Sequence, residues 1–151
     1  MKTLRLENQR EADTAALGLR LAQALFDGAF IALYGDLGAG KTTLARAIAG
    51  GLGIRGVVSP TFTIAREYEG RLPFVHFDAY RLACAQELYD IGFDDYLARG
   101  GVVVMEWCEN VPEALPAERL DIRIAGDGDA PRTIELAARG ARHEALLEAI
   151  R

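Results

Sequence analysis

The sequence predicts an α/β fold with a mixed, mainly parallel central sheet and helices on both faces. The apolar run Phe30 to Tyr34 is typical of a strand buried on both sides, and apolar residues in Lys41 to Leu52 recur at the spacing of one helix face. A strand followed by such a crossover helix favours a parallel core, while later alternating segments predict hairpins that add antiparallel strands. We expect residues 1–151 to form a single domain.

The other elements follow from the same two periodicities. Strands are predicted over Thr3 to Glu7, Phe62 to Tyr68, Leu72 to Asp78, Val102 to Trp107, Arg119 to Ala125 and Arg132 to Ala137. Helices are predicted over Glu11 to Phe26, Ala85 to Ile91, Asp94 to Leu97 and Ala141 to Ile150. Polar turns at Glu69-Gly70 and at residues 126–129 join two of the strand pairs into hairpins.

Composition excludes several classes of protein. The chain has 50% hydrophobic residues and a net charge of −5, with no run of lysines or arginines, which disfavours direct nucleic-acid binding as its main role. No apolar run approaches the ~20 residues of a membrane span, so we expect a cytoplasmic protein without membrane contact. Cys84 and Cys108 lie far apart in sequence and are expected to be free thiols.

Residues 35–42 form a complete G-x-x-x-x-G-K-[ST] motif, the phosphate-binding loop or P-loop. Between a strand and a helix, such a loop turns its backbone N–H groups toward phosphates, and the helix N-terminus adds a partial positive charge. Lys41 is expected to reach the β- and γ-phosphates, Thr42 to bind Mg²⁺, and Thr43 to lie near the α-phosphate. The predicted nucleotide-binding residues of this loop are Gly35, Asp36, Leu37, Gly38, Ala39, Gly40, Lys41, Thr42 and Thr43.

Two carboxylates end apolar strands and are candidates for the metal site. Asp78 closes one strand and Glu106 closes another, and ligands of open α/β sheets bind outside the carboxyl ends of the strands. Asp78 is the better Mg²⁺ ligand, whereas Glu106 either binds Mg²⁺ or orients the attacking water. The sequence leaves these two roles open, and it indicates Lys41, Asp78 and Glu106 as the catalytic group.

Several other residues have weaker interpretations. The loop Ser59-Pro60-Thr61 is a candidate γ-phosphate sensor, through Thr61, or an ordinary turn. His76 is expected to be a hydrogen-bonded, partly buried histidine, His143 to be solvated, and Trp107 to belong to the core. Arg132 and Glu11 are the candidate neighbours of the nucleotide base. The guanine-selecting N-K-x-D motif is absent from the sequence, which removes the main support for a Ras-like GTPase.

These motifs, in this order, resemble the bacterial TsaE family, also called YjeE. The resemblance rests on GDLGAGKTT (35–43), SPTFT (59–63), HFDAYRL (76–82), ELYDIGFDDY (87–96) and VMEW (104–107). It implies a small ATPase required for N6-threonylcarbamoyladenosine (t6A) in tRNA, which uses ATP and Mg²⁺ and acts with the TsaB and TsaD proteins, meeting tRNA only through that complex. It also implies that Lys41 and the loop amides hold ATP while Thr42, Asp78 and Glu106 form the Mg²⁺ and catalytic cluster.

Two alternatives remain at this stage. A small-molecule P-loop kinase shares the strand, loop, helix and acid, but the arginine-rich lid that covers a transferring phosphoryl group is not visible in the sequence. A nucleotide-dependent binding module would need ATP only to order the Thr61 loop.

Overall fold

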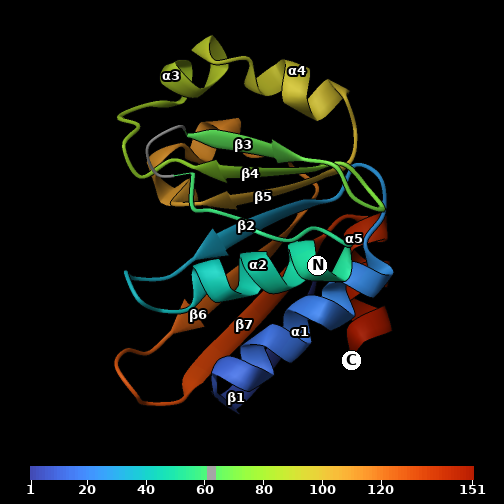
Figure 1. The fold of residues 1–151 in the computed structure, drawn as a ribbon, viewed down its shortest axis with the longest axis vertical. Coiled ribbons are helices and arrows are strands. Elements are labelled where there is room, and N and C mark those ends of the chain that lie inside the picture. The colour runs from blue at the N-terminus through green and yellow to red at the C-terminus, as the bar shows by residue number, and fades with distance from the viewer. Residues whose placement is uncertain (61–63) are drawn as a thin grey trace.

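The computed structural model describes residues 1–60 and 64–151. Its strands are β1 (Lys2–Gln9), β2 (Phe30–Tyr34), β3 (Ala65–Tyr68), β4 (Phe74–Asp78), β5 (Val102–Glu106), β6 (Arg119–Ala125) and β7 (Arg132–Arg139). Its helices are α1 (Glu11–Ala24), α2 (Lys41–Gly51), α3 (Ala85–Asp90), α4 (Phe93–Ala98) and α5 (Ala141–Ile150), with 3-10 turns η1 (Cys108–Asn110) and η2 (Pro112–Ala114). Figure 1 shows these elements arranged about one sheet.

The sheet is mixed, and its centre is parallel. The strand order is β1-β7-β6-β2-β5-β4-β3. The four central strands β6, β2, β5 and β4 pair in parallel, whereas β1 with β7, β6 with β7, and β3 with β4 pair antiparallel. Because β2, β4 and β5 run in one direction, their carboxyl ends meet at the same edge of the sheet. Both predicted hairpins, β3 with β4 and β6 with β7, are confirmed.

Helices cover both faces, as the sequence predicted. Leu17 and Leu21 of α1, Leu44 and Ile48 of α2 and residues of α5 join one buried cluster against the sheet. Leu88 of α3, Cys108 of η1 and Ala114 of η2 belong to a second cluster, which packs on the opposite face of β2, β4 and β5. In Figure 1 the α1, α2 and α5 helices lie together, apart from α3 and α4.

The two helices α1 and α2 approach each other unusually closely. A methyl group placed on Gly18 of α1 would lie 2.5 Å from the Ala47 Cβ of α2, and one on Gly51 of α2 would collide with the Ala22 Cβ of α1. Real Cβ atoms do not come this near to other heavy atoms. The contact therefore requires glycine at both positions, and it fixes the distance between the two helices.

The fold departs from the sequence prediction at His143 and at the start of β3. His143 was expected to be solvated, but it is 3% exposed, and its Nε2 accepts a hydrogen bond from the Phe30 backbone N–H at 3.1 Å. Burial lowers the pKa of His143 below its usual value. Of the strand expected over Phe62 to Tyr68, Phe62 and Thr63 lie outside the described residues, and Ile64 is not extended because its φ is +67°, so β3 begins at Ala65. Among the described helices, none has the length and apolar character needed to cross a membrane.

Candidate nucleotide site

The loop between β2 and α2 lies at the carboxyl edge of the parallel strands. It spans residues 35–40, and Lys41 is the first residue of α2. The Ala39 N–H donates to the Asp36 carbonyl at 3.1 Å, which closes a tight turn before the helix. The backbone N–H groups at the start of α2 lack helical partners and are available to an anion. This is the strand, loop and helix arrangement that the sequence motif required.

A cavity of about 290 Å³ opens on one side of this loop. We call it the Lys41 cavity, and it is lined by Leu37, Gly38, Lys41, Thr42, Ser59, Asp78, Tyr80, Glu106 and Trp107. The structure therefore brings together Lys41, Thr42, Asp78 and Glu106, the residues that the sequence indicated. Thr61, the candidate sensor, lies outside the described residues, although its neighbour Ser59 lines the cavity.

Asp78 and Glu106 are neighbours because their strands pair in parallel. The two residues are register partners across β4 and β5, and both are buried, with exposed fractions of 5% and 4%. Asp78 Oδ1 accepts a hydrogen bond from the Tyr80 backbone N–H at 2.9 Å. Glu106 Oε2 lies 2.7 Å from Nε2 of His76, which is fully buried. This contact holds the Glu106 side chain in place, with the His76 tautomer deciding which of the two groups donates.

Lys41 brings the positive charge to this cavity. The residue is 5% exposed, and its Nζ has no hydrogen-bond partner among the described residues. A buried ammonium group without acceptors is costly, so this donor is suited to phosphate oxygens. The described residues contain no cluster of three or more His, Cys, Asp or Glu side chains that would hold a metal by themselves. Thr42, Asp78 and Glu106 instead offer a few oxygen ligands, which fits Mg²⁺ shared with nucleotide phosphates.

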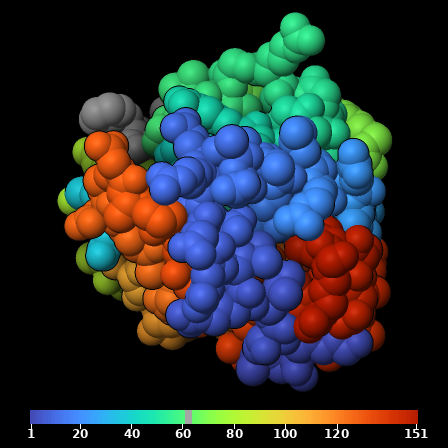
Figure 2. Space-filling model, turned by 90° about the horizontal axis from the view of Figure 1, so that it is seen from below, coloured from blue at the N-terminus to red at the C-terminus, as the bar shows by residue number. Residues whose placement is uncertain are grey.

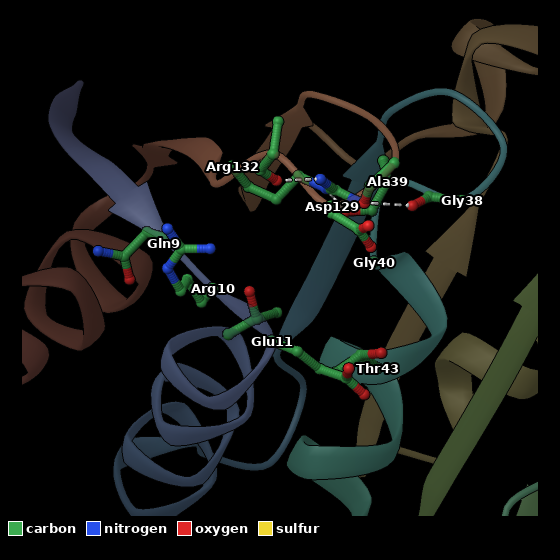
Figure 3. Close-up of a pocket in the computed structure, with 12 residues that line it drawn as sticks. Gln9, Arg10, Glu11, Gly38, Ala39, Gly40, Thr43, Asp129 and Arg132 are labelled. Atoms are coloured by element: carbon green, nitrogen blue, oxygen red, sulfur yellow. Dashed lines mark hydrogen bonds between the residues drawn. The ribbon is translucent and has the colours of Figure 1, made fainter.

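A second cavity, of about 300 Å³, opens on the other side of the loop. We call it the Arg132 cavity, and it is lined by Gln9, Arg10, Glu11, Thr14, Gly38, Ala39, Gly40, Thr43, Gly128, Asp129, Ala130 and Arg132. Figure 3 shows the start of α1 facing the loop and Arg132 across this space. The two predicted neighbours of the base, Glu11 and Arg132, both line it. The sequence did not indicate Gln9, Arg10 or Thr14.

The chain reaches this cavity from three separate places. Gln9 at the end of β1 is the register partner of Arg132 in β7, which brings the start of α1 beside the β6–β7 turn. The Asp13 side chain accepts a hydrogen bond from the Arg10 N–H at 2.9 Å and so fixes the first turn of α1. Figure 2 shows the N-terminal segment in contact with the segment that contains the β6–β7 turn. The sequence patterns did not predict these contacts, because the segments lie far apart along the chain. The alternating patterns of β1 and β7 predict two strands but not that the strands pair.

Arg132 ties the P-loop to the β6–β7 turn. Its Nε donates to the Ala39 carbonyl and one terminal nitrogen donates to the Gly38 carbonyl, both at 3.0 Å. The guanidinium also donates to the carbonyls of Asp127, Gly128 and Ala130. Figure 3 shows the bond to Gly38 as a dashed line. Most of its donors are thus used on backbone carbonyls, so Arg132 supports the wall of the cavity.

Trp107 differs from its prediction as a core residue. It is half-buried and packs at the edge of the second cluster, but its ring lines the Lys41 cavity, with the Lys41 Nζ 3.7 Å from the ring centroid. Its backbone has φ +61°, which turns the chain at the end of β5. A left-handed conformation is uncommon for a residue other than glycine, so residue type gave no signal for this turn.

The parallel sheet with a phosphate-binding loop after its central strand β2 defines the class of P-loop nucleotide-binding proteins. A family model described as "Threonylcarbamoyl adenosine biosynthesis protein TsaE" matches residues 8–134. The chain belongs to the TsaE family.

Curated relatives and a solved structure agree with this assignment. The chain is 43% identical over 150 residues to the "tRNA threonylcarbamoyladenosine biosynthesis protein TsaE" of Bacillus subtilis, covering 98% of this chain and 94% of that protein. It is 48% identical over 113 residues to the protein of the same name from Streptomyces coelicolor, covering 72% and 76%. The crystal structure of Bacillus subtilis YdiB matches with a TM-score of 0.84 at 40% identity, covering 99% of this chain and 94% of that one.

Proposed function

We propose that this chain is a Mg²⁺-dependent ATPase that acts with TsaB and TsaD in the t6A modification of tRNA. Membership of the TsaE family gives the chain its role in tRNA threonylcarbamoyladenosine biosynthesis, and a small-molecule kinase is not favoured. One observation carries the hydrolytic part of the proposal. Lys41, Thr42 and the two buried carboxylates Asp78 and Glu106 line one cavity beside the P-loop.

Each residue has a role that its position supports. The Lys41 ammonium binds the β- and γ-phosphate oxygens, because it is buried and has no acceptor among the described residues. Thr42 and Asp78 hold Mg²⁺, which when bound neutralises the charge of the phosphates. Glu106, fixed by His76 through Oε2, uses its other oxygen to orient the attacking water.

The nucleoside lies on the other side of the loop in this proposal. Thr43 lines the Arg132 cavity whereas Thr42 lines the Lys41 cavity, so consecutive side chains face the two sides of the P-loop. The start of α1 and the β6–β7 turn form the remaining walls. A single nucleotide that follows the loop would place its γ-phosphate by Asp78 and Glu106 and its base by Glu11.

The proposal is tested by the release of inorganic phosphate from Mg-ATP, measured with and without a TsaB–TsaD complex. We expect slow release by the protein alone, stimulation by the complex, and loss of activity in Lys41→Ala and Glu106→Ala. Glu135→Ala is the control, because Glu135 lies in β7, exposed and outside both cavities. Absence of hydrolysis even in the complex, with normal ATP binding by Glu106→Gln, would leave a nucleotide-dependent binding module instead.

A further inference from the structure

The Lys41 ammonium is supported by an aromatic ring. Its Nζ lies 3.7 Å from the centroid of the Trp107 ring, and it has no hydrogen-bond partner among the described residues. The π face of indole carries partial negative charge and attracts a cation, and it does so more strongly where water is excluded. Since Lys41 is 5% exposed, the contact is of the stronger kind.

The surroundings hold the Trp107 ring in this position. Trp107 has the left-handed backbone that a bulky side chain rarely adopts, so neighbouring contacts must maintain it. The Asn110 side chain donates to the carbonyls of Ala79, at 2.9 Å, and Tyr80, at 3.2 Å, which joins the turn after β5 to the chain after β4. The Tyr80 ring lies 4.9 Å from the indole at an interplanar angle of 55°.

Two carboxylates in the same cavity are the competing partners for this ammonium. Asp78 and Glu106 line the cavity with Lys41, yet among the described residues the Lys41 Nζ hydrogen-bonds to neither carboxylate. An ion pair between Lys41 and one of these carboxylates would occupy an N–H donor that the phosphates need and an oxygen that Mg²⁺ needs. The Trp107 ring stabilises the ammonium and leaves both the donors and the carboxylate oxygens available.

We propose that Trp107 is a positioning residue for Lys41: its ring keeps the ammonium away from Asp78 and Glu106 and aimed at the phosphates. This inference rests on the proposed function, because it assumes that Lys41 binds ATP. It adds that the side chain following Glu106 sets nucleotide affinity through Lys41.

Titration calorimetry of Mg-ADP tests the effect on binding. Trp107→Leu should raise the dissociation constant about 2- to 30-fold, the range that a cation–π contact supports, and Trp107→Phe should recover much of the loss because it keeps a ring. Tyr96→Leu is the matched control, since its ring carries the Arg99 guanidinium at 4.8 Å but lies outside both cavities. Far-UV circular dichroism checks that each variant is folded.

Proton NMR tests the contact itself, because the chain has only two lysines, Lys2 and Lys41, and one tryptophan. With ¹³C-lysine labelling, the ring current of Trp107 should shift the Lys41 Hε protons upfield of those of Lys2, which is half-exposed beside Glu148. The shift should be smaller in Trp107→Phe and absent in Trp107→Leu. This measurement needs no nucleotide and no substitution to show the contact.

The outcomes separate this inference from the proposed function. Equal Lys41 and Lys2 shifts, or a folded Trp107→Leu protein that binds ADP as tightly as the unsubstituted protein, would overturn the role of Trp107 and leave the ATPase proposal intact. An unsubstituted protein that binds neither ADP nor ATP would overturn the proposed function, even with the ring-current shift present. A Trp107→Phe protein as weak as Trp107→Leu would show that indole packing, not a ring face, is required, and would also overturn the inference.

Discussion

Replacement of Arg132 by alanine tests whether its hydrogen bonds to the P-loop carbonyls keep the loop ordered for nucleotide binding. The guanidinium donates to the carbonyls of Gly38 and Ala39, one bond partly buried and the other exposed. Such a bond contributes about 0.5–1.5 kcal/mol, so losing both costs the loop about 1–3 kcal/mol of preorganisation. In Arg132→Ala the nucleotide must order the loop when it binds, so the binding free energy is weakened by this amount. The expected result is a dissociation constant for Mg-ADP raised about 5- to 150-fold.

Titration calorimetry measures this effect, and the same strand supplies a control. Arg139 also lies in β7, but it pairs with Asp121 at 2.9 Å and contacts neither cavity that adjoins the loop. Arg139→Ala should therefore bind Mg-ADP normally. Arg132→Lys should lie between the unsubstituted protein and Arg132→Ala, because an ammonium cannot reproduce the five donors of a guanidinium. A folded Arg132→Ala protein with unchanged affinity would show that Arg132 does not preorganise the P-loop.

Three further predictions concern buried side chains. His76→Ala should reduce phosphate release about 10- to 100-fold while ADP binding changes little, because Glu106 loses the group that orients it. Urea unfolding should show stability falling as the pH drops below about 6.5, by at most about 1.4 kcal/mol per pH unit, because burial lowers the pKa of His143 in the folded state. The native protein should expose one reactive thiol to Ellman's reagent, Cys84, since burial raises the pKa of the Cys108 thiol and shields it.

Each of these has a clear contrary result. His76→Gln retains a donor and should be less impaired than His76→Ala; equal losses would argue against a role for the hydrogen bond. For His143 the unfolded chain takes up a proton more readily than the folded chain, so stability is complete above the unfolded pKa and is lost below it. His143→Gln keeps an acceptor for the Phe30 N–H without titrating and should flatten this dependence; an unchanged slope would assign it to other groups. Two reactive thiols before unfolding would contradict the buried position of Cys108.

Local patterns predicted those parts of the site that depend on one strand or one loop. β2 has the predicted bounds, Phe30–Tyr34, and α2 begins at the predicted residue, Lys41, because a continuous apolar run and a P-loop each have a strong signature. Asp78 and Glu106 were placed at one edge because parallel strands present their carboxyl ends together. Their roles as metal ligand and water-orienting base remain proposals.

The sequence patterns did not predict contacts between residues that lie far apart along the chain. The helical period of Ala141 to Ile150 was correct, yet it did not show that His143 lies against β2, because a histidine suits both a surface and a buried, hydrogen-bonded position. Nothing near Arg132 in sequence indicates that it binds carbonyls of the P-loop more than 90 positions away. Trp107 was expected in the core because that is the default for a large aromatic side chain. Its left-handed backbone, which redirects the ring toward Lys41, depends on tertiary contacts.

The close approach of α1 and α2 places part of the nucleotide site under the control of residues that lie outside both cavities. Gly18 and Gly51 set how near the two helices lie. The first residues of α1 form one wall of the Arg132 cavity, and the P-loop with Thr43 of α2 forms the wall opposite. A side chain at either glycine would push α1 and α2 apart and so widen the Arg132 cavity between their first turns. A genetic screen for loss of nucleotide binding should therefore recover these helix glycines beside the loop residues, and such alleles should be suppressed by smaller side chains on the facing helix.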